Sequence, residues 1–214
     1  MLTPTGMLGA GISPRHVQFG IERGAHAIAL DSGSTDSGPA YLAKAVSKTN
    51  REAIKRDLEV LMAAAHQARI PILIGSCGTS GTDAGVDWTT DIAVEVAKSL
   101  GIAPRIALLY SEQSPAVIMA RNAAGKVRPL PPAGLLADAT IVACQHIVAL
   151  MGAEPYMAAL DQGRTLCWAA VRPTRRSWRP RRCCAEQEQD PPGTPRRWPS
   201  AAASARSILA PAVC

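Results

Sequence analysis

Short apolar runs alternate with amphipathic stretches along most of this 214-residue chain. Three of the runs are bounded by turn-forming residues and predict buried strands near residues 26–30, 70–74 and 106–110. The clearest helical spacing of apolar side chains follows Asn50, a good N-cap, and extends from Arg51 to about Ala68. Strand, polar loop and helix thus repeat three times, which predicts an α/β fold with a mostly parallel, Rossmann-like sheet.

Weaker helical patterns occupy many of the remaining positions. The one that follows Ser13 has proline at its first position and Gly24 beyond its end, and these residues are typical of helix termini. In a parallel sheet connected by helices, the loops that follow the strands gather at one edge, where ligands bind. The predicted helices other than the one above cover about residues 14–23, 41–46, 86–101, 115–124, 136–151 and 154–160.

A glycine-rich loop, Gly75 to Gly85, joins the second predicted strand to the next helix. Such a loop aims backbone N–H groups and a helix N-terminus at a ligand, which favours binding of a phosphate or a carboxylate. A flexible strand-to-helix connection explains the same glycines, and that alternative stays open. Neither the P-loop pattern nor the dinucleotide-binding pattern of glycines is present. The candidate substrate- and anion-binding residues in this loop are Gly75, Ser76, Gly78, Thr79, Ser80 and Gly81.

Carboxylates stand in the loops after the first and third predicted strands. Asp31 and Asp36 lie in one polar loop, and Glu112 follows the third strand. Each is a candidate catalytic residue, because a carboxylate at this edge can act as a general base or orient a substrate hydroxyl. Aspartates in Ser/Gly-rich turns also cap the amides of their own loop, which is the structural alternative. Ser34 and Thr35, between the two aspartates, are candidate substrate-binding residues.

The other reactive side chains show no pattern of a known site. The six cysteines have neither metal-ligand spacing nor the arrangement of a disulfide framework, so no metal is expected. Cys77 lies in the glycine-rich loop, where a helix N-terminus could lower its pKa, but no histidine neighbours it in sequence. The histidines are scattered and are predicted to be packing or surface residues: His16, His26, His66 and His146.

Charge is distributed unevenly along the chain. Residues 1–164 carry 14 basic and 14 acidic side chains, whereas residues 165–214 carry nine arginines against three acidic residues. The second segment supplies the whole net charge of +6 and holds seven of the 17 prolines. We therefore expect an α/β domain over residues 1–163 and a disordered, Arg/Pro/Trp-rich tail over residues 164–214.

The N-terminus lacks the basic and apolar regions of a signal peptide. No apolar run reaches the roughly 18 residues that cross a bilayer. A cytoplasmic location without a membrane partner is therefore expected.

Five short segments, taken together, resemble the acyclic terpene utilization AtuA family: Thr3–Gly9, Asp31–Pro39, Lys55–Glu59, Gly75–Gly81 and Met151–Pro155. The resemblance covers about residues 1–163 and implies a cytoplasmic catabolic enzyme of citronellol or geraniol degradation. It implies a site built from the second and fourth of these segments. One reaction proposed for the family is a carbon–carbon lyase step on a branched acyl-CoA, so the resemblance implies a small-molecule substrate with a CoA thioester as its handle. It also implies a homo-oligomer or a companion subunit for an intact family member.

The resemblance ends after Gly163, where family members continue with another strand and a Gly-Arg-x-x-Asp-Thr-Ala segment. With GC-rich codons for Trp168 to Arg179, reading from the third nucleotide gives Gly-Gly-Arg-Pro-Thr-Asp-Thr-Ala-Val-Leu-Ala. That peptide is the family continuation in another frame. We therefore interpret the tail as an out-of-frame reading and the chain as a truncated, inactive enzyme fragment that lacks its fourth strand.

The basic tail also supports a different function. Arginine and tryptophan side chains bind nucleic acid through phosphates and stacked bases, so an anion- or nucleic-acid-binding module is the alternative. The out-of-frame interpretation implies no specific nucleic-acid binding. Salt-dependent retention on heparin or DNA, compared with a chain that ends at Gly163, distinguishes the two interpretations.

Overall fold

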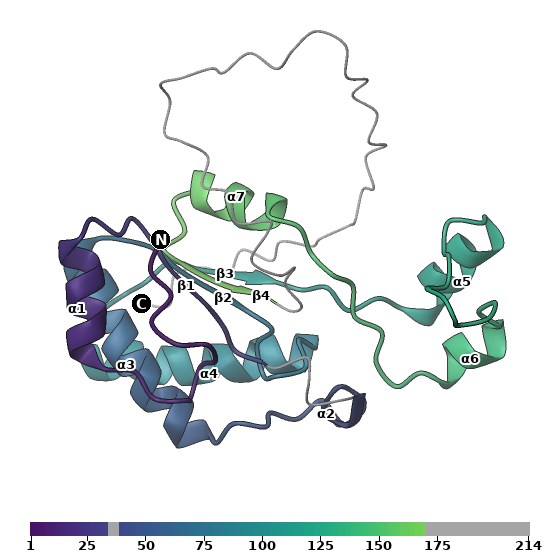
Figure 1. The fold of residues 1–214 in the computed structure, drawn as a ribbon, viewed down its shortest axis with the longest axis horizontal. Helices are drawn as coiled ribbons and strands as arrows, with labels where there is room; N and C mark the ends of the chain where they lie inside the picture. Colours follow the sequence, from purple (N-terminus) through teal and green to yellow (C-terminus); the bar gives the residue numbers. More distant parts are fainter. Residues whose placement is uncertain (34–38, 170–214) are drawn as a thin grey trace, which may run out of the picture.

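A parallel sheet forms the centre of the structure, a computed structural model that describes residues 1–33 and 39–169. The sheet has four strands in the order β1-β2-β4-β3, and every pairing is parallel (Figure 1). The strands are β1 (Ile28–Asp31), β2 (Ile72–Gly75), β3 (Ile106–Leu109) and β4 (Leu166–Ala169). The first three confirm the predicted strands, and the predicted α/β class with a parallel sheet is confirmed.

Helices cover both faces of the sheet. In chain order they are α1 (Pro14–Glu22), α2 (Pro39–Lys44), α3 (Arg51–Ala68), α4 (Asp83–Leu100), α5 (Pro115–Ala123), α6 (Asp138–Ala143) and α7 (Glu154–Asp161). Figure 1 shows α3 and α4 on one face, with α1 beside α3, and α7 on the other face. The same view shows α5 and α6 packed on each other in an arm that projects from the sheet.

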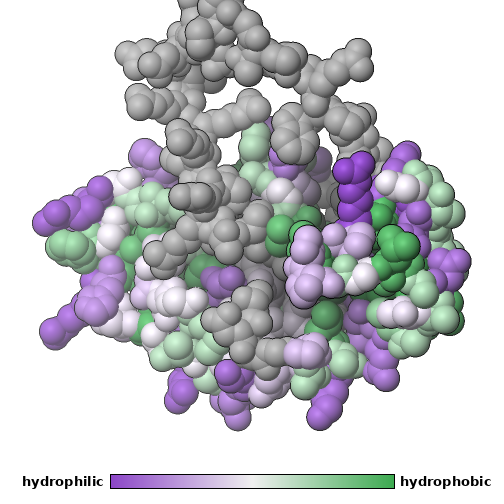
Figure 2. Space-filling model, turned by 45° about the vertical axis from the view of Figure 1, so that its right-hand side comes forward, coloured by the Kyte–Doolittle hydropathy of each residue, from purple (hydrophilic) through white to green (hydrophobic). Residues whose placement is uncertain are grey.

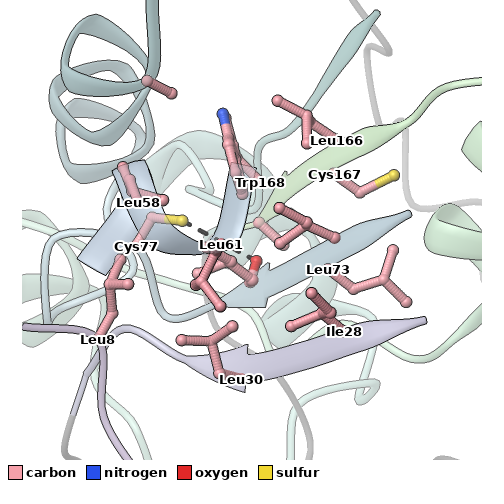
Figure 3. Close-up of a cluster of buried hydrophobic side chains, with 14 of the residues drawn as sticks. Leu8, Ile28, Leu30, Leu58, Leu61, Leu73, Cys77, Leu166, Cys167 and Trp168 are labelled. Atoms are coloured by element: carbon pink, nitrogen blue, oxygen red, sulfur yellow. Dashed lines mark hydrogen bonds between the residues drawn. The ribbon is translucent and has the colours of Figure 1, made fainter. Parts of the chain in front are cut away.

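The sheet is buried because its strands are almost wholly apolar. All four residues of β2 and all four of β4 are buried. α3 presents Ile54, Leu58 and Leu61 to the core at helical spacing, and all three are fully buried. Figure 3 shows Leu58 and Leu61 among the buried side chains. Each large apolar side chain removed from water contributes roughly 1.5–3 kcal/mol, so this contact is a main source of stability.

One carboxylate is buried on α3 and holds the N-terminal loop. Asp57 is 4% exposed, and its Oδ2 accepts hydrogen bonds from the amides of Gly9 (2.7 Å) and Gly11 (3.2 Å). A carboxylate can be buried when hydrogen bonds from the protein replace those that it would make to water. The same N-terminal loop also contacts the end of β1, where the Leu8 amide donates to the Asp31 carbonyl at 2.8 Å.

The fourth strand corrects the expectation that the domain ends at residue 163 without it. β4 lies between β2 and β3, and Leu166 is opposite both Ile72 and Ile106. The packed domain therefore extends at least to Ala169. A central strand needs only a short apolar run, and Leu-Cys-Trp-Ala supplies one.

The fit of Trp168 in this strand is incomplete. Its side chain is fully buried, yet its Nε1 has no hydrogen-bond partner within the described part of the chain. A buried indole N–H normally donates to an acceptor, and one that does not costs about 1–3 kcal/mol. The strand is thus held by apolar packing and its backbone ladder.

The predicted helix at residues 136–151 is wrong in its second half. α6 ends at Ala143, and the following segment lies alongside residues 111–113. The Gln113 amide donates to the Ile147 carbonyl at 2.7 Å, and the Ala149 amide donates to the Ser111 carbonyl at 3.0 Å. These tertiary hydrogen bonds replace helical ones. The other predicted helices are confirmed to within about three residues at their ends.

The arm, residues 115–143, exposes much apolar surface. α5 has no buried residue. Figure 2 shows polar and apolar surface interspersed on the side of the molecule that is turned forward. The large apolar residues exposed on the arm are Val117, Leu130, Leu135 and Val142.

Several predictions concern residues outside the described part. Residues 34–38, which include the candidates Ser34, Thr35 and Asp36, lie outside the described residues. The predicted disordered tail lies outside them from residue 170 onward. Across residues 1–33 and 39–169, no helix combines the length and the apolar character needed to cross a bilayer.

A surface ion-pair cluster joins α3 to α4. The Glu95 carboxylate lies 2.8 Å from Arg51 and 2.5 Å from Lys55. Hydrogen bonds from Lys55 and Arg51 lower the pKa of Glu95 from 4.5 to about 2. Because the folded-state pKa is lowered, the stabilisation is complete above pH 4.5 and is lost as the pH falls toward 2.

Replacing Glu95 by glutamine is therefore expected to destabilise the chain at pH 7 and to have less effect at about pH 3. Urea unfolding at both pH values, followed by circular dichroism, measures the change. Glu22→Gln, on the exposed surface of α1, is the control and should leave the midpoint nearly unchanged at both pH values. An equal effect of Glu95→Gln at pH 7 and pH 3 would contradict the linkage.

Candidate functional site

The loops that follow β1 and β2 meet at the carboxyl edge of the sheet. Asp31 is opposite Gly75 in the β1–β2 register, and the Ser32 amide donates to the Gly75 carbonyl at 2.7 Å. A Cβ atom on Gly33 would lie 2.3 Å from the Thr79 carbonyl oxygen, so the two loops touch. The prediction that these loops share one edge is confirmed.

The glycine-rich loop is a tightly packed connection. Ser76 and Thr79 have left-handed backbones, with φ of 53° and 70°, and such a conformation is strained for a β-branched residue. The Thr79 side chain compensates, because its Oγ1 accepts a hydrogen bond from the Lys48 amide at 3.0 Å. A Cβ on Gly85 would lie 2.4 Å from the Cys77 carbonyl oxygen, so the loop also packs directly on α4.

Two residues of this loop, Gly78 and Thr79, are buried. The amides of Gly78 and Thr79 make no hydrogen bond to any other described residue. Neighbouring free N–H groups in a tight turn form a concave site for an anion or for an oxygen with partial negative charge. The two amides therefore stay candidates for the predicted anion-binding role.

The N-terminus of α4 is less available than the sequence suggested. The Thr82 hydroxyl accepts from the Gly85 amide at 3.2 Å, and the Glu112 carboxylate accepts from the Asp83 amide at 3.1 Å. Two helix-start donors expected to face a ligand are therefore already bonded within the protein. A ligand would have to be bound by the loop amides rather than by these two.

Asp83, at the start of α4, and Glu112, in the loop after β3, are joined by two reciprocal hydrogen bonds. The Glu112 amide donates to the Asp83 Oδ1 at 3.2 Å, which reciprocates the bond from the Asp83 amide to the Glu112 carboxylate. Burial raises the pKa of Asp83, and the charge of Glu112 raises it further. The two hydrogen bonds hold the Glu112 side chain at the edge of the sheet.

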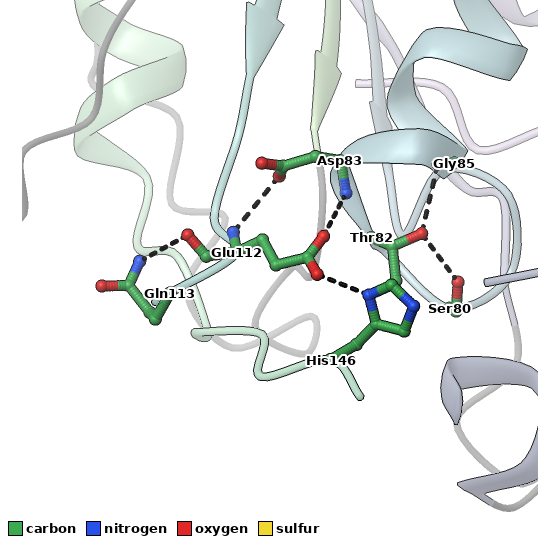
Figure 4. Close-up of polar contacts among 7 residues, drawn as sticks. All are labelled: Ser80, Thr82, Asp83, Gly85, Glu112, Gln113 and His146. Carbon is green, nitrogen blue, oxygen red and sulfur yellow. Dashed lines mark hydrogen bonds and ion pairs between the residues drawn. The ribbon is translucent and has the colours of Figure 1, made fainter. Parts of the chain in front are cut away.

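His146 binds the other oxygen of the same carboxylate. Its Nδ1 lies 2.5 Å from the Glu112 Oε1 (Figure 4). The side chains are 25% and 23% exposed, so the pair is partly shielded but accessible to a small molecule. Figure 4 shows the imidazole on the side of Glu112 that faces Thr82 and Ser80.

No pattern in the sequence indicated this pair, and the prediction of a packing or surface role for His146 did not anticipate it. His146 is 34 residues from Glu112 and lies in a segment that was predicted to be helical. It reaches Glu112 because residues 147 and 149 pair with residues 113 and 111. Only that long-range pairing defines the position of the imidazole.

A hollow of about 310 Å³ adjoins Glu112. Its volume is at the small end of the roughly 300–1,000 Å³ typical of ligand pockets. Its polar lining residues are Asp83, Glu112, Gln113, Ser114, Cys144 and Gln145.

The other predicted catalytic residue of the described chain, Asp31, caps its own loop. Its Oδ1 accepts a hydrogen bond from the Gly33 amide at 2.9 Å, which is the structural alternative considered for it. Beside it, the buried hydroxyl of Ser32 has no partner among residues 1–33 and 39–169, and the same holds for Ser111 at the end of β3. Both serines stand at the edge where Asp31 and Glu112 stand.

Two of the three described cysteines, Cys77 and Cys167, are buried, whereas Cys144 is exposed and lines the hollow beside Glu112. Cys77 is fully buried, and burial raises its pKa to about 12, so the thiol stays protonated at neutral pH. Burial likewise raises the pKa of Cys167 in β4 to about 12. In the region for which side chains are placed, no three histidine, cysteine or acidic residues form a group that could hold a metal ion.

Comparison with protein families, with curated proteins and with solved structures finds no match to this chain. The site is therefore assigned from its own geometry. Its candidate groups are the amides of Gly78 and Thr79, which have no partner among the described residues, the loop at Asp31, and the Glu112–His146 pair.

Proposed function

We propose that this chain is a catabolic enzyme domain of the acyclic terpene utilization type, acting in the cytoplasm on a branched acyl thioester. The observation that carries the proposal is the hydrogen-bonded pair of Glu112 and His146 at the carboxyl edge of a parallel sheet. Ligands of such sheets bind at that edge, and a carboxylate–imidazole pair is suited to proton transfer. The family resemblance over residues 1–163 supplies the substrate class.

The reaction we propose is a carbon–carbon lyase step. A base removes the proton of a hydroxyl group on the carbon β to the thioester, the bond between the α and β carbons breaks, and the β carbon becomes a carbonyl. The electron pair left on the α carbon is delocalised onto the thioester oxygen and then takes up a proton. Free N–H groups stabilise such an oxyanion, and we assign this role to the amides of Gly78 and Thr79, which make no hydrogen bond to another described residue.

The chain as it stands is expected to turn over little substrate. A missing strand is not the reason, because β4 completes the sheet. The reason is that the sequence after Gly163 departs from the family pattern, whose Gly-Arg-x-x-Asp-Thr-Ala segment would place an arginine for an anionic substrate group. We propose that this segment is present in another reading frame of the gene.

Resequencing of the gene and an assay of two chains test the proposal. We expect a chain with the frame restored after Gly163 to cleave a branched 3-hydroxyacyl-CoA, whereas the 214-residue chain shows little or no cleavage. Mass spectrometry of the thioester substrate and product measures turnover. Equal turnover by both chains would contradict the out-of-frame interpretation, and no turnover by either would contradict the lyase function.

A further inference from the structure

We infer that His146 Nε2 is the atom that exchanges a proton with the substrate, and that Glu112 is a positioning residue rather than the base. The inference rests on the proposed function and assigns roles within that site. It reverses the order expected from the sequence, in which Glu112 is the catalytic candidate and His146 a packing residue.

Both oxygens of Glu112 are already engaged. Oε2 accepts from the Asp83 amide at 3.1 Å, and Oε1 lies 2.5 Å from His146 Nδ1. The carboxylate is therefore held in one orientation from two sides. Each oxygen thus directs one lone pair at α4 or at the imidazole, and the imidazole, whose second nitrogen has no such contact, is the better placed general base.

The imidazole has the complementary arrangement. A carboxylate next to Nδ1 favours the tautomer with the proton on Nδ1, which leaves the lone pair of Nε2 free to accept a proton. Nε2 has no hydrogen bond to any residue within 1–33 and 39–169, and a quarter of the side chain is exposed. When Nε2 takes up a proton, the Glu112 carboxylate stabilises the imidazolium, as the third group of a catalytic triad does.

The backbone around His146 is rigid enough to hold this geometry. The Ile147 carbonyl accepts from the Gln113 amide at 2.7 Å, and the Ala149 amide donates to Ser111 at 3.0 Å. The ring lies on the side of Glu112 that faces Thr82 and Ser80, where the glycine-rich loop enters α4 (Figure 4). The proton acceptor therefore lies beside the start of α4, at the end of the loop that carries the amides of Gly78 and Thr79.

In the lyase step the hydroxyl proton moves to Nε2 as the carbon–carbon bond breaks. The imidazolium then returns a proton to the α carbon of the departing thioester. Proton and electron pair are balanced, because the proton taken from the hydroxyl group is the one that replaces the broken bond. No oxidant, reductant or co-reactant is required.

Nitrogen-15 NMR of the histidine rings in the 214-residue chain tests the pairing without any need for turnover. We expect the neutral His146 ring to carry its proton on Nδ1, and Glu112→Gln to move it substantially toward Nε2. Glu59→Gln, on α3, is the matched control and should leave the His146 tautomer unchanged. A His146 tautomer that is the same in the wild type and in Glu112→Gln overturns the assignment of Glu112.

Turnover by the chain with the restored frame tests the role of His146. His146→Gln should lower kcat by about 10²–10⁴-fold with little change in KM, and added imidazole should restore part of the loss in His146→Gly. Glu112→Gln should lower kcat less and should alter the pH–rate profile. Unchanged kcat in His146→Gln overturns the inference. Absence of turnover in every chain counts against the lyase function alone, because the tautomer measurement still decides the pairing.

Discussion

Replacing Trp168 by alanine is expected to lower the free energy of unfolding by about 2–4 kcal/mol. Trp168 is fully buried in β4, the strand between β2 and β3. Truncating a buried tryptophan to alanine typically costs about 3–5 kcal/mol. The loss is reduced here because the variant also removes the indole N–H, which has no partner within the described residues.

Urea unfolding followed by circular dichroism measures this change. Phe19→Ala is the control, because the Phe19 ring on α1 is 58% exposed and its removal should cost less than about 1 kcal/mol. The result also decides between two descriptions of the segment after Gly163. A Trp168→Ala variant as stable as the wild type would mean that this segment does not belong to the packed domain, as the sequence alone suggested.

The second large effect is expected at the contact between the glycine-rich loop and α4. Gly85→Ala should lower the free energy of unfolding by about 2 kcal/mol, although alanine favours a helix by about 1 kcal/mol over glycine. A Cβ at Gly85 would lie 2.4 Å from the Cys77 carbonyl and 3.2 Å from the Gly78 Cα. Both neighbours are backbone, so the loop itself would have to move.

Thermal and urea unfolding measure the loss, and Gly6→Ala is the control. A Cβ at Gly6 would meet nothing within 4 Å, so that variant should stay within about 0.5 kcal/mol of the wild type. A displaced loop would also move Gly78, whose Cα is one of the two neighbours of a Cβ at Gly85. If Gly85→Ala proves as stable as the wild type, the close packing of loop on helix is wrong.

Some residues of the proposed site could be predicted from the sequence and others could not. Asp31 and Gly75 follow apolar runs, so their place at the ends of parallel strands could be predicted, and the register confirms it. Glu112 follows a third run in the same way. His146 follows no strand and is held by an antiparallel bridge between Glu112 and Val148, which no local pattern announces.

The fourth strand, β4, also could not be predicted from its local sequence. Leu166 to Ala169 is four residues long and is buried on every side. Such a run is too short to show a period, and its neighbour residues carry the composition of the basic tail. The position between β2 and β3 accepts a short apolar segment whose backbone can pair with both strands. β4 occupies it for that reason.

The elements that could be predicted from the amino-acid sequence are those whose signals are local. The apolar runs, the cap at Asn50 and the helical spacing along α3 depend on residues within a few positions of one another. Tertiary structure alone decided the insertion of β4, the end of α6 at Ala143, and the pairing of Glu112 with His146. Each of these depends on hydrogen bonds between segments tens of residues apart, and the free energy of such contacts cannot be read from either segment alone.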